Sequence, residues 1–141
     1  MTNDTPAIVP ELDVSNLDRS LAVYVDVLGF TCTFQRPEER FAYLVRERAH
    51  LMLEEANGPG RRFSTAPLEF PFGRGVNLQI EVSSVDPLYA SVQRAKLTVP
   101  IPLEERWYRQ DAVEAGNRQF VVADPDGYLL RFFQDLGKRP A

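Results

Sequence analysis

Hydrophobic and polar residues alternate in short runs over the first 55 residues, interrupted by one stretch of helical spacing. Residues 8–14 (IVPELDV) alternate weakly and contain Val and Ile, which predicts a strand. Residues 15–30 (SNLDRSLAVYVDVLGF) have apolar positions at helical spacing, with Ser15 or Asn16 as the cap and Gly29 as the terminator. Three further runs, FTCTFQ, RFAYLVR and HLMLEE, predict strands. This half is therefore predicted as β-α-β-β-β.

The second half repeats this order after a long interruption. Residues 55–74 are rich in Gly and Pro and show no periodicity, which predicts a linker or lid. Residues 76–82 (VNLQIEV) alternate cleanly as a strand, and residues 83–97 predict a helix with Ser84 as the cap. The runs IPLEERWYR, NRQFVVAD and YLLRFFQ complete a second β-α-β-β-β module.

The two halves align as an internal repeat. Residues 9–18 lie over 77–86 without a gap, and residues 41–53 lie over 120–132, so that the turns RERA and DPDG coincide. The predicted fold class is α+β, with two tandem βαβββ modules forming a half-open curved sheet around a cleft. The boundaries are 1–54 for the first module, 55–74 for the linker or lid, 75–135 for the second module and 136–141 for a C-terminal tail, within one domain overall.

Strand alternation separates an apolar face, which packs under the helices, from a mixed polar face. A concave mixed surface suits a small-molecule site, although the same residues would also coat a solvated sheet. The mixed face is predicted to carry Val9, Glu11, Asp13, His50, Met52, Glu54, Asn77, Gln79, Glu81, Leu129, Arg131 and Phe133.

Composition narrows the class of protein. The 141 residues are 44% hydrophobic and 26% charged, as in soluble globular proteins, and no apolar run approaches the roughly 20 residues of a membrane span. The single cysteine, Cys32, excludes intrachain disulfides and fits a reducing compartment, so a cytoplasmic location is expected. A net charge of −4 argues against nucleic acid as a partner and tolerates a cationic ligand.

The paired modules, the segment LDVSNLDRSLAVYVDVLGF and the motif DPDGYLLRF resemble the vicinal oxygen chelate superfamily, which includes glyoxalase I, extradiol dioxygenases, and fosfomycin- and bleomycin-resistance proteins. The resemblance covers about residues 7–135 and identifies the scaffold, not the reaction. Enzymes of that superfamily hold a divalent metal at four strand positions, which the resemblance places at Val9, Met52, Asn77 and Arg131. None is a usual ligand, and Arg131 would repel a cation. His50, the only histidine, with Glu11, Asp13 or Glu54 is the remaining candidate for a metal.

A chain with this scaffold but without metal-ligating residues at these positions resembles the bleomycin-resistance branch. Members of that branch are dimers that sequester a cationic drug in clefts at the subunit interface. No cofactor and no metal is then expected. One departure is that the drug-binding members carry a tryptophan where this chain has Gly116. The resemblance and the mixed face together predict ligand contacts at Glu11, Asp13, Phe34, Phe41, Met52, Asn77, Glu81, Trp107, Tyr108, Arg131 and Phe133.

The resulting expectation is a metal-independent protein that binds a cationic or heteroaromatic small molecule at a homodimer interface and does not transform it. Arg131 orients a ligand carboxylate or phosphate, or pairs with Glu54 or Glu81. The alternatives are a metal-dependent or acid-base enzyme using His50, Glu11 or Glu81, and a structural module without a cavity. Asp124 and Asp126 are predicted to form a turn with Pro125 and Gly127, not to act in catalysis.

Overall fold

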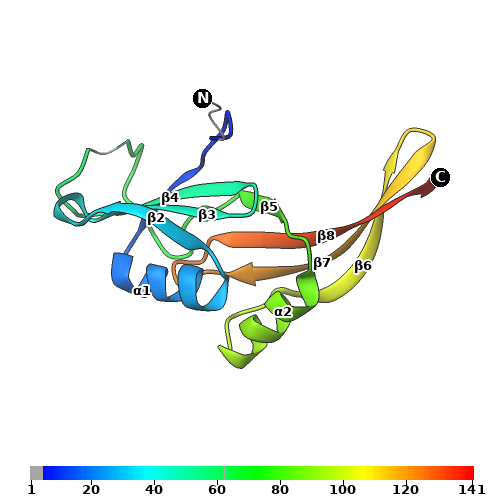
Figure 1. The fold of residues 1–141 in the computed structure, drawn as a ribbon. Helices are drawn as coiled ribbons and strands as arrows, with labels where there is room; N and C mark the ends of the chain where they lie inside the picture. The colour runs from blue at the N-terminus through cyan, green and yellow to red at the C-terminus, as the bar shows by residue number, and fades with distance from the viewer. Residues whose placement is uncertain (1–4, 62) are drawn as a thin grey trace. The chain divides into compact units, whose positions relative to one another are not determined.

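In a computed structural model, which describes residues 5–61 and 63–141, the chain divides into two compact units, Met1–Phe70 and Pro71–Ala141. Figure 1 shows that each unit contains one curved sheet with a helix beside it. The elements of the first unit are β1 (Glu11–Val14), α1 (Leu17–Leu21), the π-helix η1 (Ala22–Val27), β2 (Thr31–Arg36), the 3-10 turn η2 (Pro37–Glu39), β3 (Phe41–Arg46) and β4 (Ala49–Glu55). Those of the second unit are β5 (Asn77–Glu81), α2 (Val85–Arg94), β6 (Ile101–Gln110), β7 (Val113–Ala123) and β8 (Leu129–Pro140).

The predicted fold class is confirmed, because both units have the β-α-β-β-β order and the same sheet topology. The strand orders are β1-β4-β3-β2 and β5-β8-β7-β6, with the first pair of each sheet parallel and the others antiparallel. The parallel registers also correspond, since Glu11 lies opposite Met52 and Gln79 lies opposite Arg131. The repeat is thus present in the hydrogen-bonded pairing as well as in the sequence.

One part of the predicted repeat alignment is wrong by a residue. Tyr43 pairs with Met52, whereas Val121 pairs with Arg131, so β3 and β7 superimpose with Phe41 over Gln119 instead of Phe120. The cause is the turn between the strands: Val45 and His50 enclose four residues, whereas the equivalent pair Ala123 and Leu129 encloses five. Because a shift of one residue reverses the face of a strand, Phe120 lies in the core and Gln119 on the mixed face.

The predicted apolar faces form the cores beneath the helices. Buried residues of the first unit include Leu12, Val14, Leu17, Tyr24, Leu44 and Leu53, and those of the second include Ile80, Val82, Leu88, Phe120, Leu130 and Phe132. Phe120 stacks on Phe132, with ring centroids 5.7 Å apart.

The helix predicted over residues 15–29 is only five residues of α-helix followed by six of π-helix. A hydrogen bond from the Leu28 amide to the Val23 carbonyl closes its last turn. The helix ends at Gly29, which has a φ of 79°.

The strands of the second unit are longer than predicted. Residues 136–140, expected to be part of a tail, continue β8, and β7 begins at Val113. Figure 1 shows β6, β7 and β8 running on past α2 as a ribbon. The segment between β4 and β5, predicted as a linker or lid, contains no helix or strand among its described residues and includes the boundary between the two units.

The DPDG segment is a turn, as predicted. The Asp124 carboxylate accepts hydrogen bonds from the amides of Asp126 (2.8 Å) and Tyr128 (2.9 Å), and Gly127 has a φ of 91°. Both aspartates are buried. Burial and the two amide bonds give the Asp124 carboxylate a structural role in fixing the turn that precedes β8.

Candidate functional site

The mixed face of the first unit contains a pocket of about 270 Å³. It is formed by strands β1 to β4, by the turn η2 and by the segment that follows β4. The lining residues are Glu11, Phe34, Arg36, Glu39, Phe41, Tyr43, Met52, Glu54, Arg61 and Phe63.

Aromatic rings form one wall of this pocket. Phe34, 48% exposed, is stacked on Tyr43 with centroids 5.0 Å apart and planes at 13°. Phe41 is buried beneath the Arg36 guanidinium, which lies 3.9 Å from the ring centroid. Tyr43 was not among the predicted contacts, although alternation with Phe41 along β3 places it on the same face. The wall therefore offers a flat exposed ring and already accommodates one cation.

Carboxylates are concentrated beside these rings. Glu11 and Glu54 lie on the adjacent strands β1 and β4, and Glu54 is only 5% exposed. Glu39 pairs with Arg36 at 2.7 Å, and this hydrogen bond is the main cause of the raised pKa of the Arg36 guanidinium. The other lining cation, Arg61, lies 5.2 Å from the Phe63 ring. Acidic and aromatic groups together suit a cationic flat molecule.

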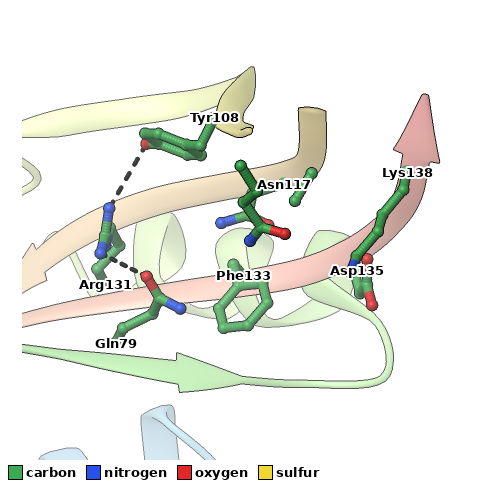
Figure 2. A pocket seen from close by; sticks show the side chains of 9 residues that line it. Gln79, Tyr108, Asn117, Arg131, Phe133, Asp135 and Lys138 are labelled. Carbon is green, nitrogen blue, oxygen red and sulfur yellow. Dashed lines mark hydrogen bonds between the residues drawn. The ribbon is translucent and has the colours of Figure 1, made fainter. Parts of the chain in front are cut away.

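The mixed face of the second unit contains a separate pocket of about 320 Å³ (Figure 2). It lies over strands β5 to β8, partly on the ribbon beyond α2. The lining residues are Gln79, Tyr108, Gln110, Ala115, Asn117, Arg131, Phe133, Asp135 and Lys138.

Arg131 is the central cation of this second pocket. Its Nη2 donates to the Gln79 side-chain oxygen, and its Nη1 donates to the Tyr108 hydroxyl at 3.5 Å, as the dashed lines in Figure 2 mark. Its Nε is buried without a hydrogen-bond partner. Within residues 5–61 and 63–141 Arg131 makes no ion pair, so the expected partner Glu81 is replaced by two neutral groups.

The Tyr108 hydroxyl is hydrogen bonded to a network of two side-chain amides, those of Gln119 and Asn117. The Gln119 side-chain nitrogen donates to the Tyr108 hydroxyl at 2.6 Å and to Glu104 at 3.0 Å, and the Gln119 oxygen accepts from Asn117 at 3.5 Å. Gln119 and Asn117 are buried. Neither was a predicted site residue, because the correct face of β7 follows only from its pairing with β8.

Four of the predicted contacts lie outside the lining of both pockets: Asp13, Asn77, Glu81 and Trp107. Trp107 faces away from Tyr108 because successive residues of a strand point to opposite faces. Its ring covers Gly116, where an added Cβ would be 2.6 Å from the indole, and the Arg139 guanidinium lies 4.0 Å from the ring. The remaining predicted contacts lie in a pocket: Glu11, Phe34, Phe41 and Met52 in the first, and Tyr108, Arg131 and Phe133 in the second.

The residues at the expected metal positions have other surroundings. Met52 lines the first pocket and Arg131 the second, while Asn77 is exposed opposite Leu129. The His50 Nδ1 is hydrogen bonded to the Tyr43 hydroxyl at 2.8 Å. In the described part of the chain, no three His, Cys, Asp or Glu side chains are grouped as metal ligands would be.

Cys32 has none of the features of an activated nucleophile. Burial is the largest influence on its thiol and raises the pKa above the ordinary value. Its Sγ donates to the Phe34 carbonyl at 3.4 Å. A raised pKa keeps the thiol protonated and less reactive.

The sheet topology, the repeated registers and the sequence place the chain in a known class. The model of the Glyoxalase/Bleomycin resistance protein/Dioxygenase superfamily matches residues 9–132, and the chain belongs to this superfamily. Bleomycin resistance proteins from Geobacillus stearothermophilus and Staphylococcus aureus are each 30% identical to it over 135 residues, covering 91% of this chain and 96% of the relative.

Solved structures share the fold. TioX from Micromonospora sp. ML1 is 26% identical with a TM-score of 0.69, covering 93% of this chain and 99% of that one. A superfamily member from Alicyclobacillus acidocaldarius, at 19% identity and a TM-score of 0.63 over 96% of both chains, shows the fold alone. No helix formed by the described residues is long and apolar enough to cross a membrane.

Proposed function

We propose that the protein is a cytoplasmic binding protein of the bleomycin-resistance type, which sequesters a cationic or heteroaromatic compound without transforming it and so confers resistance. The observation that carries this proposal is the first pocket, where the exposed Phe34 ring stacked on Tyr43 lies beside Glu11 and Glu54. The 30% identity to bleomycin resistance proteins supports the same function.

The ring wall explains how such a compound would be held. A flat ligand stacked on Phe34 gains on the order of 1 kcal/mol beyond the burial of its apolar surface. A cationic group on the ligand is attracted by the acidic residues and by the ring faces. Both contributions are available on side chains that strands β1 to β4 hold in place.

Titration calorimetry with bleomycin tests the proposal. We expect saturable binding by the wild-type protein and an affinity reduced about tenfold in Phe34→Ala, because stacking and ring burial are lost together. Phe70→Ala is the matched control, since Phe70 is a 70% exposed ring outside both pockets. Absence of heat from bleomycin and related cationic compounds, under conditions where a known resistance protein responds, would remove the drug assignment.

Metal independence is part of the proposal. It is supported by the chemistry of Met52 and Arg131 at two expected metal positions, since a thioether is a soft ligand and a guanidinium repels cations. Elemental analysis of protein purified without chelators should give well under one Fe, Mn, Ni or Zn per chain. A stoichiometric metal would instead favour a metal-dependent enzyme.

We also propose a homodimer, in keeping with the resemblance to dimeric resistance proteins. Each sheet ends in exposed edge strands, and β6 to β8 extend beyond α2, so backbone donors and acceptors are available for pairing. Sedimentation equilibrium should give twice the chain mass of 16.0 kDa. A single species at the chain mass would contradict the dimer.

A further inference from the structure

We infer that the pocket of the second unit is a binding site for the carboxylate of a small organic anion that has a flat apolar body. The pocket is distinct from the acidic, aromatic pocket of the first unit, and it has the opposite charge preference. The inference shares only one premise with the proposed function, namely that ligands enter the mixed sheet faces.

The first observation is the state of Arg131. A guanidinium has five N–H donors and no acceptor, and those of Arg131 are directed at two neutral groups, Gln79 and Tyr108. Its Nε is buried and has no hydrogen-bond partner. A buried donor without a partner is costly, and a positive charge without a counterion attracts an anion. The pocket therefore contains a cation whose charge and donors the neighbouring side chains leave unsatisfied.

The second observation is the direction of the remaining donors. Because Arg131 can only donate, Gln79 presents its oxygen to Arg131 and keeps its NH₂ group as a donor. The Tyr108 hydroxyl accepts from both Gln119 and Arg131, so its lone pairs are occupied and its own proton is left to donate. In the described part of the chain, no acceptor takes that proton. Arg131, Gln79 and Tyr108 thus offer donors at one place.

The third observation is the charge at the rim. Lys138 adds a second cation to the lining, and among the described residues it forms no ion pair. The one lining carboxylate, Asp135, accepts a hydrogen bond from the Gly137 amide at 2.8 Å. With two cations against one carboxylate, the pocket has a positive balance within a chain of net charge −4.

The fourth observation is the apolar part of the lining. Phe133 lies between Arg131 and Asp135 in the close view (Figure 2). Ala115, on the neighbouring strand β7, also lines the pocket. A volume of about 320 Å³ is at the lower end of the range for small-molecule sites. A single aromatic ring with one carboxylate therefore fits both the size and the polarity of the pocket.

The test uses benzoate as the probe and benzamide as its neutral isostere, with the full-length protein. Binding is followed by two-dimensional ¹H–¹⁵N spectra that include the arginine Nε–H signals. We expect benzoate to bind with a dissociation constant on the order of 1 mM, to shift the Arg131 Nε–H signal, and to bind at least about tenfold more tightly than benzamide.

The variants separate charge from geometry. Arg131→Gln should weaken benzoate binding about tenfold, and Tyr108→Phe should weaken it by a smaller factor, because one donor is lost without loss of charge. Arg131→Lys should retain binding only partly, since an ammonium lacks the planar fork. Arg109→Gln is the matched control, because Arg109 is an exposed arginine of β6 outside the pocket and should leave the affinity unchanged.

Three results would overturn the inference: equal binding of benzamide and benzoate, shifts confined to residues outside the second pocket, or Arg131→Gln with wild-type affinity and an unchanged thermal transition. Inorganic phosphate that displaces benzoate at equal concentration would also overturn it, because the apolar body would then contribute nothing. Since benzoate carries no positive charge, these results are independent of bleomycin binding, and either proposal can fail while the other stands.

Discussion

At the scale of single residues, the space at Gly116 is limited by the side chain that covers it. The Trp107 ring lies against its backbone, at a distance where a side chain at position 116 would collide with the indole. Gly116, at the position where the resemblance predicts a tryptophan in drug-binding members, is therefore covered by a tryptophan from the neighbouring strand. Trp107 is in turn covered by the Arg139 guanidinium.

Gly116→Ala should destabilise the protein by about 1–3 kcal/mol, because the new methyl group overpacks the contact with Trp107. In the Trp107→Ala background the same substitution should cost much less, since the space is then open. Chemical denaturation of the four proteins of this double-mutant cycle measures the coupling. Equal costs in both backgrounds would show that the ring does not limit position 116.

The exposed pair of Asp86 and Arg118 gives a prediction about pH. The Arg118 guanidinium donates to both carboxylate oxygens, at 2.8 and 3.3 Å, and this hydrogen bonding is the main cause of the lowered pKa of Asp86. A pKa lowered by folding contributes stability that is present above the unfolded-state pKa of about 3.9 and is lost as the pH falls through the folded value.

Carboxyl ¹³C spectra recorded against pH should therefore give Asp86 a pKa below the ordinary aspartate value, and the Arg118→Met variant should return it toward that value. Arg94→Met serves as the control, because Arg94 is an exposed arginine of α2 outside this pair. An unchanged Asp86 pKa in Arg118→Met would contradict the assignment of the shift to this contact.

At the scale of elements, the first backbone amide of each helix donates a hydrogen bond to a side chain from the sheet beneath it. The Glu55 carboxylate accepts from the Leu17 amide, and the Gln134 side-chain oxygen accepts from the Val85 amide, both at 3.0 Å. Glu55 and Gln134 occupy equivalent positions of the repeat, as do Leu17 and Val85. Asn16, one of the two predicted caps, also caps α1, whereas the side chain of the predicted cap Ser84 makes no capping bond to α2. The sheet thus fixes where each helix starts.

Gln134→Ala should destabilise the protein by about 1 kcal/mol, because the first turn of α2 loses its only side-chain acceptor in the described structure. Gln93→Ala, an exposed glutamine on the same helix, is the control and should change the free energy of unfolding by less than about 0.5 kcal/mol. Urea denaturation of both variants checks this, and equal small effects would remove Gln134 as a cap.

At the scale of the whole molecule, the two copies of the repeat have diverged in charge. The position that is Met52 in the first copy is Arg131 in the second, and Glu11 corresponds to Gln79. The first pocket consequently has three glutamates, two arginines and aromatic rings in its lining, whereas the second has two cations, one carboxylate and neutral donors. The two copies of one scaffold therefore carry pockets whose linings differ in charge.

Because both proposed interactions are between charges, raising the NaCl concentration from about 0.05 to 0.5 M should weaken the binding of bleomycin and of benzoate alike. Calorimetry at the two salt concentrations provides the measurement, with Phe34→Ala and Arg131→Gln as references for each pocket. An affinity for either ligand that rises or stays constant with salt would mean that apolar contacts, not charge, control its binding.

Much of the fold could be predicted because it depends on local patterns. The alternation in IVPELDV and VNLQIEV, the helical spacing after each, and the DPDG turn all reflect period and turn chemistry within about ten residues. The alignment of β3 with β7 was wrong because the lengths of the two turns differ, which no pattern within either strand reveals. The extension of β8 to Pro140 was missed because Gly137, Lys138 and Arg139 carry no apolar alternation, and pairing with β7 extends the strand.

The sequence by itself determined the two-module order, the apolar faces beneath the helices, and the place of Arg131 on the mixed face, where the resemblance predicts a metal ligand in the enzymes. Only the tertiary structure decided which groups surround that arginine: Gln79 comes from the parallel neighbour, and Tyr108 reaches it from β6 with the support of Gln119 on β7. The physical reason is that faces follow from local alternation, whereas partners follow from register, and register is fixed by contacts between residues far apart in the chain.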